Sequence, residues 1–155
     1  KQKCELLTEE ELRRMRYADL SDSISQTFAR DMFFFSIYCR GISFTDLAHI
    51  RKSDIKGFTL TYTSQMLTPP IVTVQWEAMQ AIADRHPSST DYLFPIIKSD
   101  DKIMESREIG RVRENITKAL KLIATRCNLS IVPSLKMTKD IYQRAIDNVS
   151  VSKII

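Results

Sequence analysis

The sequence predicts a mainly α-helical fold that contains a small antiparallel β-sheet, an α+β architecture. Apolar residues recur at steps of three or four in several segments, which is typical of amphipathic helices. Between the first and last of these segments lie two short β-rich runs, FTLTYT at 58–63 and IVTVQ at 71–75. The chain has 155 residues, of which 43% are hydrophobic and 27% charged. This is enough for one domain with a hydrophobic core.

A capping box predicts the first helix. In Thr8-Glu9-Glu10-Glu11 the Thr8 hydroxyl can accept from a free helix N–H, while the Glu11 carboxylate reaches back to Thr8. We expect this helix to end near Asp19. A second helix is predicted within residues 21–39, buried on most sides because Phe33 and Phe34 widen its apolar stripe. The stripe follows helical spacing at Ile24, Phe28, Met32, Phe35 and Cys39.

Turn and cap residues divide the middle of the chain. Gly41 is typical of a helix C-cap, and Ser43 with Asp46 three residues later predicts the N-cap of a short helix through Ile50. The two β-rich runs are joined by SQMLTPP, whose prolines forbid a continuous strand. A β-hairpin is therefore predicted, with room for a third edge strand.

The clearest helical pattern lies at residues 106–128. Its apolar face comprises Ile109, Val112, Ile116, Leu120, Ile123 and Cys127. Another face carries Arg111, Glu114, Lys118 and Lys121. Two interpretations of that face stand side by side: solvated ion pairs within the helix, which the residues alone favour, or a basic stripe that follows DNA phosphates. Helices are also predicted at residues 76–85 and from Thr138 onward, after a break at Pro133.

Charge and composition narrow the classes of function. The net charge of +4 and the pI of about 9.0 favour a polyanionic partner. Cys4, Cys39 and Cys127 are far apart, and with only His49 and His86 in the chain no metal motif is formed. The three glycines form no phosphate-binding loop. We therefore expect no metal and no cofactor, and no apolar run approaches the length that a membrane span requires.

Several segments resemble one enzyme family. FARDMFFFSIYCRGISFTDLAHIRKSDI at 28–55 resembles the conserved first box of tyrosine recombinases, also called phage integrases. The family's helix, its Gly-Leu-Arg turn and its later Ser-Asp correspond here to residues 28–39, 41–43 and 53–54. The likeness extends to TEEELRRMR, VQWEAMQAI, DYLFPII and the long helix, and MTKDIYQRAID at 137–147 resembles the family's closing box. The Arg-Gly-X-Ser turn at 40–43 is similar to that of the branch carried on bacterial mobile elements.

The resemblance implies DNA integration or excision by strand cutting and rejoining. Residues 1–155 would form a single, partial catalytic domain without the family's N-terminal DNA-clamping domain. The partner would be double-stranded DNA, bound as a homo-tetramer in the bacterial cytoplasm at the nucleoid. Tyr142 would be the nucleophile that becomes joined to the 3′ phosphate, so no cofactor is needed. The expected DNA contacts are Arg40, Lys52, Arg111, Lys118 and Lys121.

The first box departs from the family pattern at its arginine. Ser43 occupies that position. We therefore expect Arg40, three residues earlier, to contact the phosphate, because a guanidinium can bind two phosphoryl oxygens at once. The residues alone also allow plainer roles. Ser43 suits an N-cap, Arg40 suits a helix C-terminus, and Tyr142 suits packing on an amphipathic helix.

Other catalytic groups of the family are missing. Leu67 stands where the hairpin turn should carry a lysine, and no lysine or arginine occurs between Gly57 and Trp76. Residues 130–138 contain neither the second arginine nor the histidines, and His49 and His86 do not fill the gap by position. A helical block is therefore missing near Pro133–Ser134, through a gene deletion, a shortened expression product or disordered residues omitted from the sequence. We expect the 155 residues alone to be inactive or nearly so.

Two alternatives remain open. The chain could be a non-catalytic DNA-binding remnant, with salt-sensitive affinity but no cleavage. It could instead interact only with other protein chains such as a recombinase, for which the apolar segment NVSVSKII at 148–155 is suited.

Overall fold

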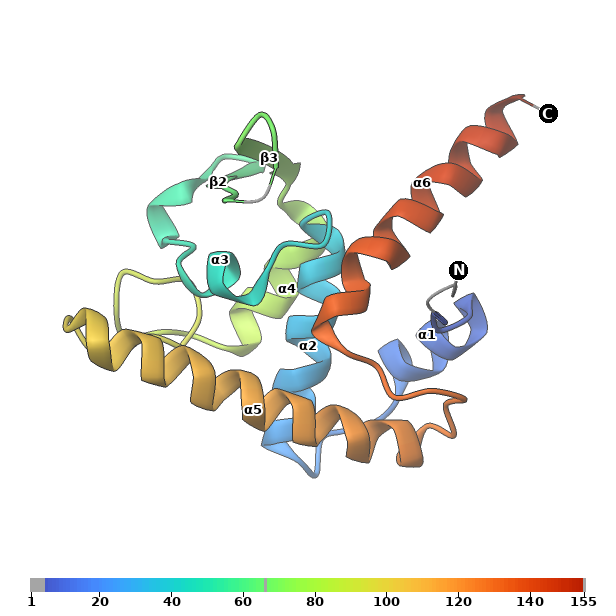
Figure 1. Cartoon of the computed structure of the whole chain (residues 1–155), viewed down its shortest axis with the longest axis horizontal. Coiled ribbons are helices and arrows are strands. Elements are labelled where there is room, and N and C mark those ends of the chain that lie inside the picture. Colours follow the sequence, from blue (N-terminus) through green and yellow to red (C-terminus); the bar gives the residue numbers. More distant parts are fainter. Residues whose placement is uncertain (1–4, 66, 155) are drawn as a thin grey trace. The chain divides into compact units, whose positions relative to one another are not determined.

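The structure is a computed structural model, which describes residues 5–65 and 67–154 and their side chains as far as residue 148. It confirms the predicted mainly helical fold with a small antiparallel sheet (Figure 1). The α-helices are α1 (Glu9–Tyr17), α2 (Ile24–Tyr38), α3 (Phe44–Ala48), α4 (Glu77–Arg85), α5 (Lys102–Arg126) and α6 (Thr138–Ile154). The strands are β1 (Ile55–Lys56), β2 (Thr59–Thr63) and β3 (Ile71–Gln75), and the short 3-10 helices are η1 (Lys52–Asp54) and η2 (Leu135–Met137).

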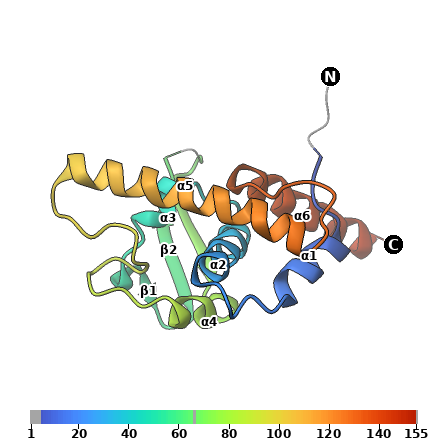
Figure 2. The ribbon, with the colours of Figure 1, turned by 90° about the horizontal axis from the view of Figure 1, so that it is seen from below.

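The chain forms two compact units. One comprises Lys1–Gly41 and Asn115–Ile155, and the other comprises Ile42–Glu114. Helix α5 is a single continuous helix that begins in the second unit and ends in the first (Figure 2). The first unit is therefore built from both ends of the sequence.

Caps and long side chains fix the helices of the first unit. The predicted capping box is present: the Glu11 N–H donates to Thr8 Oγ1 at 3.1 Å, and the Thr8 N–H donates to Glu11 Oε1 at 2.9 Å. At the other end of α1, the Arg30 guanidinium on α2 donates to three main-chain carbonyls, those of Met15, Arg16 and Ala18. These carbonyls would otherwise lack partners at the helix end.

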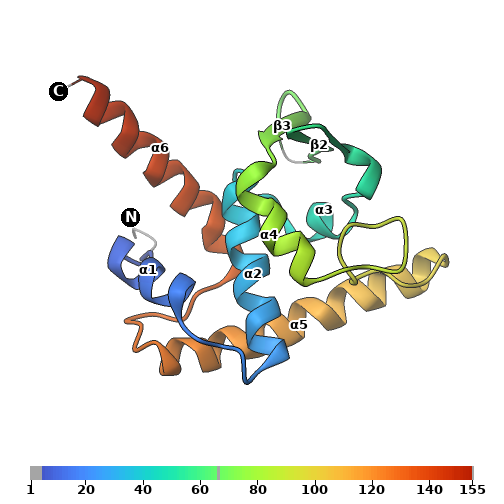
Figure 3. The same ribbon diagram turned by 180° about the vertical axis from the view of Figure 1, so that it is seen from behind.

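Helix α2 forms the centre of this core. Met32, Phe33 and Phe35 are fully buried, as the sequence predicted. The prediction is wrong for Ile24, which is 89% exposed because it lies in the first turn of α2, directly after the N-cap Ser23, beyond the packed part of the helix. Helices α2 and α6 pack against each other, and in Figures 1 and 3 the first turns of α6 lie beside α2 while its later turns run away from it.

The second unit contains the sheet, in the order β1-β2-β3 with antiparallel pairing throughout. The predicted hairpin and its third edge strand are both present. Along β2 and β3 burial alternates, so that Leu60, Tyr62, Val72 and Val74 face the core while the threonines between them are exposed. The opposing register pairs Thr61 with Thr73, and their hydroxyls lie 3.0 Å apart.

Candidate functional site

Helix α2 ends in a Schellman motif whose left-handed residue is Arg40. The Arg40 N–H donates to the Ile37 carbonyl at 3.0 Å, and the Gly41 N–H donates to the Ser36 carbonyl at 2.7 Å. Arg40 has a φ of 62°, a conformation that costs a non-glycine residue about 1 kcal/mol. The expectation that Gly41 would take this position is wrong, because Gly41 is one residue further on, where a different constraint applies.

That constraint is the close approach of Gly41 to the first turn of α6. Gly41 also has a positive φ, of 78°, and a Cβ added to it would overlap the Cα of Lys139 and lie 2.6 Å from its Cβ. Only glycine fits between the two segments. The Arg40–Gly41 turn therefore lies directly against the helix that carries Tyr142, in one compact unit.

Tyr142 lies one turn after Lys139 on α6. Its neighbour Ile141 is 3% exposed and packed in the core, which fixes the rotation of the helix about its axis. Tyr142 is half-buried at the edge of that contact. Within residues 5–65 and 67–148 its hydroxyl makes no hydrogen bond. Its role as a nucleophile stays a prediction.

Ser43 has a local structural role in the second unit. Its side chain is the N-cap of α3, where Oγ accepts from the Asp46 N–H at 3.1 Å. Asp46 in turn is buried, and its carboxylate accepts from the Gln65 N–H at 3.4 Å, which links α3 to the end of the hairpin. The geometry around Ser43 is thus explained by capping, and a catalytic part for it stays untested.

The hairpin turn offers no cationic group in its described part, residues 64–65 and 67–70. Leu67 is half-buried and its main-chain N–H donates to Ser64 Oγ at 3.2 Å. A hydrocarbon side chain at this position can neither bind a phosphate nor transfer a proton.

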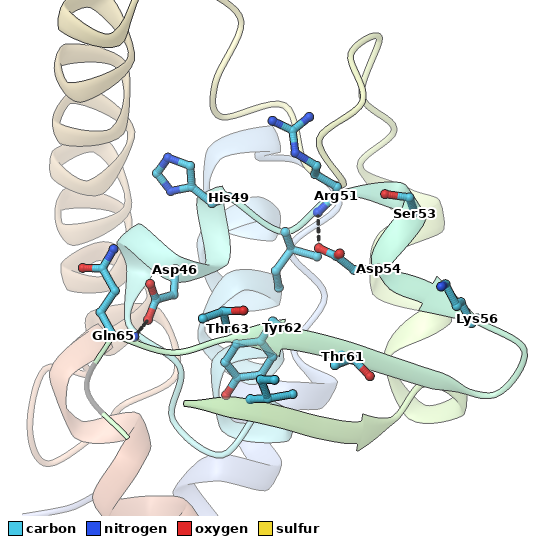
Figure 4. A pocket seen from close by; sticks show the side chains of 12 residues that line it. Asp46, His49, Arg51, Ser53, Asp54, Lys56, Thr61, Tyr62, Thr63 and Gln65 are labelled. Atoms are coloured by element: carbon cyan, nitrogen blue, oxygen red, sulfur yellow. Dashed lines mark hydrogen bonds between the residues drawn. The ribbon is translucent and has the colours of Figure 1, made fainter. Parts of the chain in front are cut away.

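A hollow of about 650 Å³ lies between α3, η1 and the exposed side of the sheet. Figure 4 shows Asp46, His49, Arg51 and Lys56 among its lining residues. His49 is held in place at both ring nitrogens: Nδ1 lies 2.7 Å from the Thr45 carbonyl oxygen and Nε2 lies 2.5 Å from Glu105 Oε1. Arg51 stacks over the Tyr92 ring at 4.6 Å. These contacts hold α3 and η1 to the rest of the second unit.

The predicted DNA contacts fall on several elements. Arg40 is exposed in the first unit together with Lys118 and Lys121 on α5, while Lys52 and Arg111 are exposed in the second. Lys52 Nζ donates to the Ser88 carbonyl at 2.8 Å.

Sequence reasoning missed Arg113. Its guanidinium donates to Thr45 Oγ1 at 3.0 Å and lies 5.7 Å from the Phe44 ring centroid. Thr45 and Phe44 are far from Arg113 in sequence, and the residue pattern of α5 does not predict contacts with them.

Positive charge is concentrated in one part of the chain. Residues 115–155 contain seven Lys and Arg against two Asp and Glu, a net charge of +5, whereas residues 42–114 contain nine against ten, a net charge of −1. Residues 1–41 are balanced at seven each. The excess therefore belongs to the second half of α5, to η2 and to α6, in the unit that also holds Arg40 and Tyr142.

The described residues offer neither a metal-binding cluster nor a helix suited to a membrane span. In the part of the chain that the structure describes, no three His, Cys, Asp or Glu residues are grouped so as to hold a metal ion. No helix of the described residues is both long enough and apolar enough to cross a membrane. In NVSVSKII, the side chains from Val149 onward lie outside the described residues.

Comparison with solved structures identifies the fold. XerA recombinase superposes with a TM-score of 0.60 at 14% identity, over 94% of this chain and 51% of that chain. A lambda integrase dimer bound to a COC′ core site gives 0.58 at 16% identity, over 93% and 41%, and lambda integrase bound to DNA gives 0.55 at 16%, over 92% and 52%. No protein-family model and no curated protein matches the sequence. The chain thus has the fold of a tyrosine recombinase catalytic domain and spans about half the length of these structures.

Proposed function

We propose that this chain acts on double-stranded DNA as the catalytic domain, or part of one, of a tyrosine recombinase. The observation that carries the proposal is the contact between the Arg40–Gly41 turn and the first turn of α6. It brings a guanidinium and a tyrosine, taken from the two sequence boxes that resemble the family, into one compact unit. The net charge of +5 on residues 115–155 supports DNA as the partner.

The proposed chemistry follows from the two side chains. The Tyr142 oxygen attacks the phosphorus, the bond to the 5′ oxygen breaks, and a 3′-phosphotyrosyl link forms. The tyrosine proton passes to solvent, and the 5′ oxygen takes up a proton. Arg40 counters the charge that develops on the phosphoryl oxygens, as a guanidinium does without losing its own charge.

The missing general acid and the missing second arginine and histidines lower the expected catalytic activity. No described side chain of the hairpin turn can protonate the leaving oxygen, and between α5 and α6 the only helical element is η2. A general acid contributes about 10²- to 10⁴-fold and one donor to a developing oxyanion about 10²- to 10³-fold. We therefore expect the 155 residues to bind DNA and to form little or no covalent adduct.

The mobile-element origin, the tetramer on DNA and the bacterial nucleoid belong to the same proposal. The Arg-Gly-X-Ser turn at 40–43 supports the mobile-element origin, and the DNA-bound integrase structures that share the fold support DNA as the partner.

The test measures binding and covalent adduct formation on the same DNA. Fluorescence anisotropy with a mixed-sequence duplex should give affinity that falls steeply between 50 and 200 mM salt, by about 10³-fold if six phosphates are contacted. A nicked duplex that traps the cleaved strand should give at most a trace of adduct, and Tyr142→Phe should abolish that trace. Absence of DNA binding would overturn the proposal. An abundant adduct that Tyr142→Phe removes would instead show that the chain is fully active.

A second candidate is a DNA-binding remnant that no longer cuts. Leu67 and the absence of a longer helix between α5 and α6 in the described residues favour it. Under this candidate Tyr142→Phe changes neither binding nor adduct, because no adduct forms in any variant.

A further inference from the structure

We propose that Lys139 is a second phosphate-binding residue of this site, where it and Arg40 hold one DNA phosphate beside Tyr142. The inference rests on the proposed function. It gives a phosphate-binding role to Lys139, a residue that the sequence motifs do not indicate. It starts from the position of the Lys139 main chain against Gly41.

The contact at Gly41 brings Lys139 next to Arg40. Because a Cβ on Gly41 would meet the N, Cα and Cβ of Lys139, the two segments touch through their main chains. Arg40 directly precedes this contact, and its left-handed conformation sets the direction in which its side chain leaves the turn. Two cationic side chains therefore start from adjacent points, although they come from opposite ends of the chain.

Lys139 is also a close neighbour of Tyr142. Residues three apart on a helix lie on the same side, with Cβ atoms about 5 to 6 Å apart. The lysine stem is long enough to bring its ammonium to a group held at the tyrosine hydroxyl. The nearest acid on α6, Asp140, is one residue further along and so points about 100° away around the helix.

The Lys139 ammonium has no structural partner among the described residues. The side chain is exposed, and it forms no hydrogen bond or ion pair with any residue that the structure describes. Structural lysines and arginines in this chain do form such contacts, as Lys52 does with Ser88 and Arg126 with Asp22. An exposed cation that has no partner in the described part of the chain, beside an arginine and a tyrosine, is suited to a phosphate.

The two cations differ in a way that suits a shared phosphate. A guanidinium binds two oxygens in a fixed plane, whereas an ammonium is a compact charge on a flexible stem. Together the Arg40 guanidinium and the Lys139 ammonium can donate hydrogen bonds to both non-bridging oxygens of the phosphate. The phosphorus then stays accessible to the Tyr142 oxygen.

The test is a double-variant cycle on DNA affinity at fixed salt. Lys139→Gln and Arg40→Gln should each weaken binding to a mixed-sequence duplex, and Lys139→Arg should restore most of the affinity. Since both residues hold one phosphate, the combined variant should differ from the product of the single effects by more than about twofold. Circular dichroism and urea unfolding check that each variant is folded, which we expect because both side chains are exposed.

Lys136 on η2 provides the matched control, as an exposed lysine three residues before Lys139. Lys136→Gln combined with Arg40→Gln should give the product of the single effects. The inference would be overturned if Lys139→Gln bound DNA as tightly as the wild type. It would also be overturned if the affinity of the combined variant equalled the product of the two single effects. In both cases the proposed function would stand. Absence of DNA binding by the wild-type chain would overturn both.

Discussion

At the scale of single residues, Glu11 connects the two ends of the first unit. Its Oε1 accepts from the Thr8 N–H, and its Oε2 accepts from the Ser130 N–H at 2.6 Å, in the loop that follows α5. The side chain is almost fully buried. The hydrogen bonds from the Ser130 and Thr8 main chain lower the pKa of Glu11 from 4.5 to about 2. One carboxylate thus fixes both the start of α1 and the path of the chain toward α6.

We expect Glu11→Gln to destabilise the fold at neutral pH. The charged acceptor would be replaced by a neutral amide that cannot accept at both oxygen positions, at a cost of about 2 kcal/mol. Because the folded-state pKa is lowered, the stabilisation is fully present above about pH 4.5. It is lost as the pH falls toward 2. Urea unfolding at pH 7, 4.5 and 3 should show the wild type approaching the variant at the lowest pH.

The neighbouring Glu10→Gln is the matched control. Glu10 is exposed and, among the described residues, pairs only with Arg13 on the same helix, at 2.9 Å, so its loss should change stability by less than about 0.5 kcal/mol. A pH-independent difference between wild type and Glu11→Gln would contradict the proposed origin of the effect.

At the scale of elements, the packing of α2 on α6 depends on Gly41. Gly41→Ala forces a Cβ into the main chain of Lys139 at a positive φ, and we expect it to cost about 2 to 4 kcal/mol. Gly57 also has a positive φ, of 61°, but no atom lies within 4 Å of an added Cβ. Gly57→Ala should therefore cost only about 1 kcal/mol. Urea midpoints of the two variants measure the difference, and equal losses would rule out the clash.

Elements whose signals are local could be predicted from the sequence. The capping box at Thr8, the N-cap at Ser43 and the helix begun at Thr138 all depend on residues within one turn, and the structure has each of them. The hairpin was predictable for the same reason, because its strands are neighbours in the chain.

The candidate site depends on contacts that no local pattern encodes. Arg40 is left-handed because it ends α2 in a Schellman motif, while glycine is needed at the next position, where α6 packs against the turn. Burial along α2 was predicted from periodicity, but the exposure of Ile24 depends on where neighbouring elements stop. Lys139 has no motif of its own. Its place beside Arg40 follows only from the main-chain contact between Gly41 and Lys139 in the folded chain.

At the scale of the whole molecule, the two units differ in net charge. The unit Ile42–Glu114 has a net charge of −1, although it contains nine Lys and Arg, because its acids offset them. The +5 of residues 115–155 has no such balance. A polyanion is attracted by the local excess, so DNA affinity should depend on the basic residues of α5 and α6.

The last prediction compares two pairs of lysines on the same helix or just before it. Lys118 and Lys121 lie exposed on the part of α5 that belongs to the positive unit. Changing both to Gln should lower the slope of log affinity against log salt by about 1.8, if each lysine neutralises one phosphate. Changing Lys98 and Lys102 to Gln removes the same charge from the other unit and should leave the slope nearly unchanged. Equal changes from both pairs would mean that DNA responds only to net charge, and the basic face of α5 would then reflect solvated pairing within the helix.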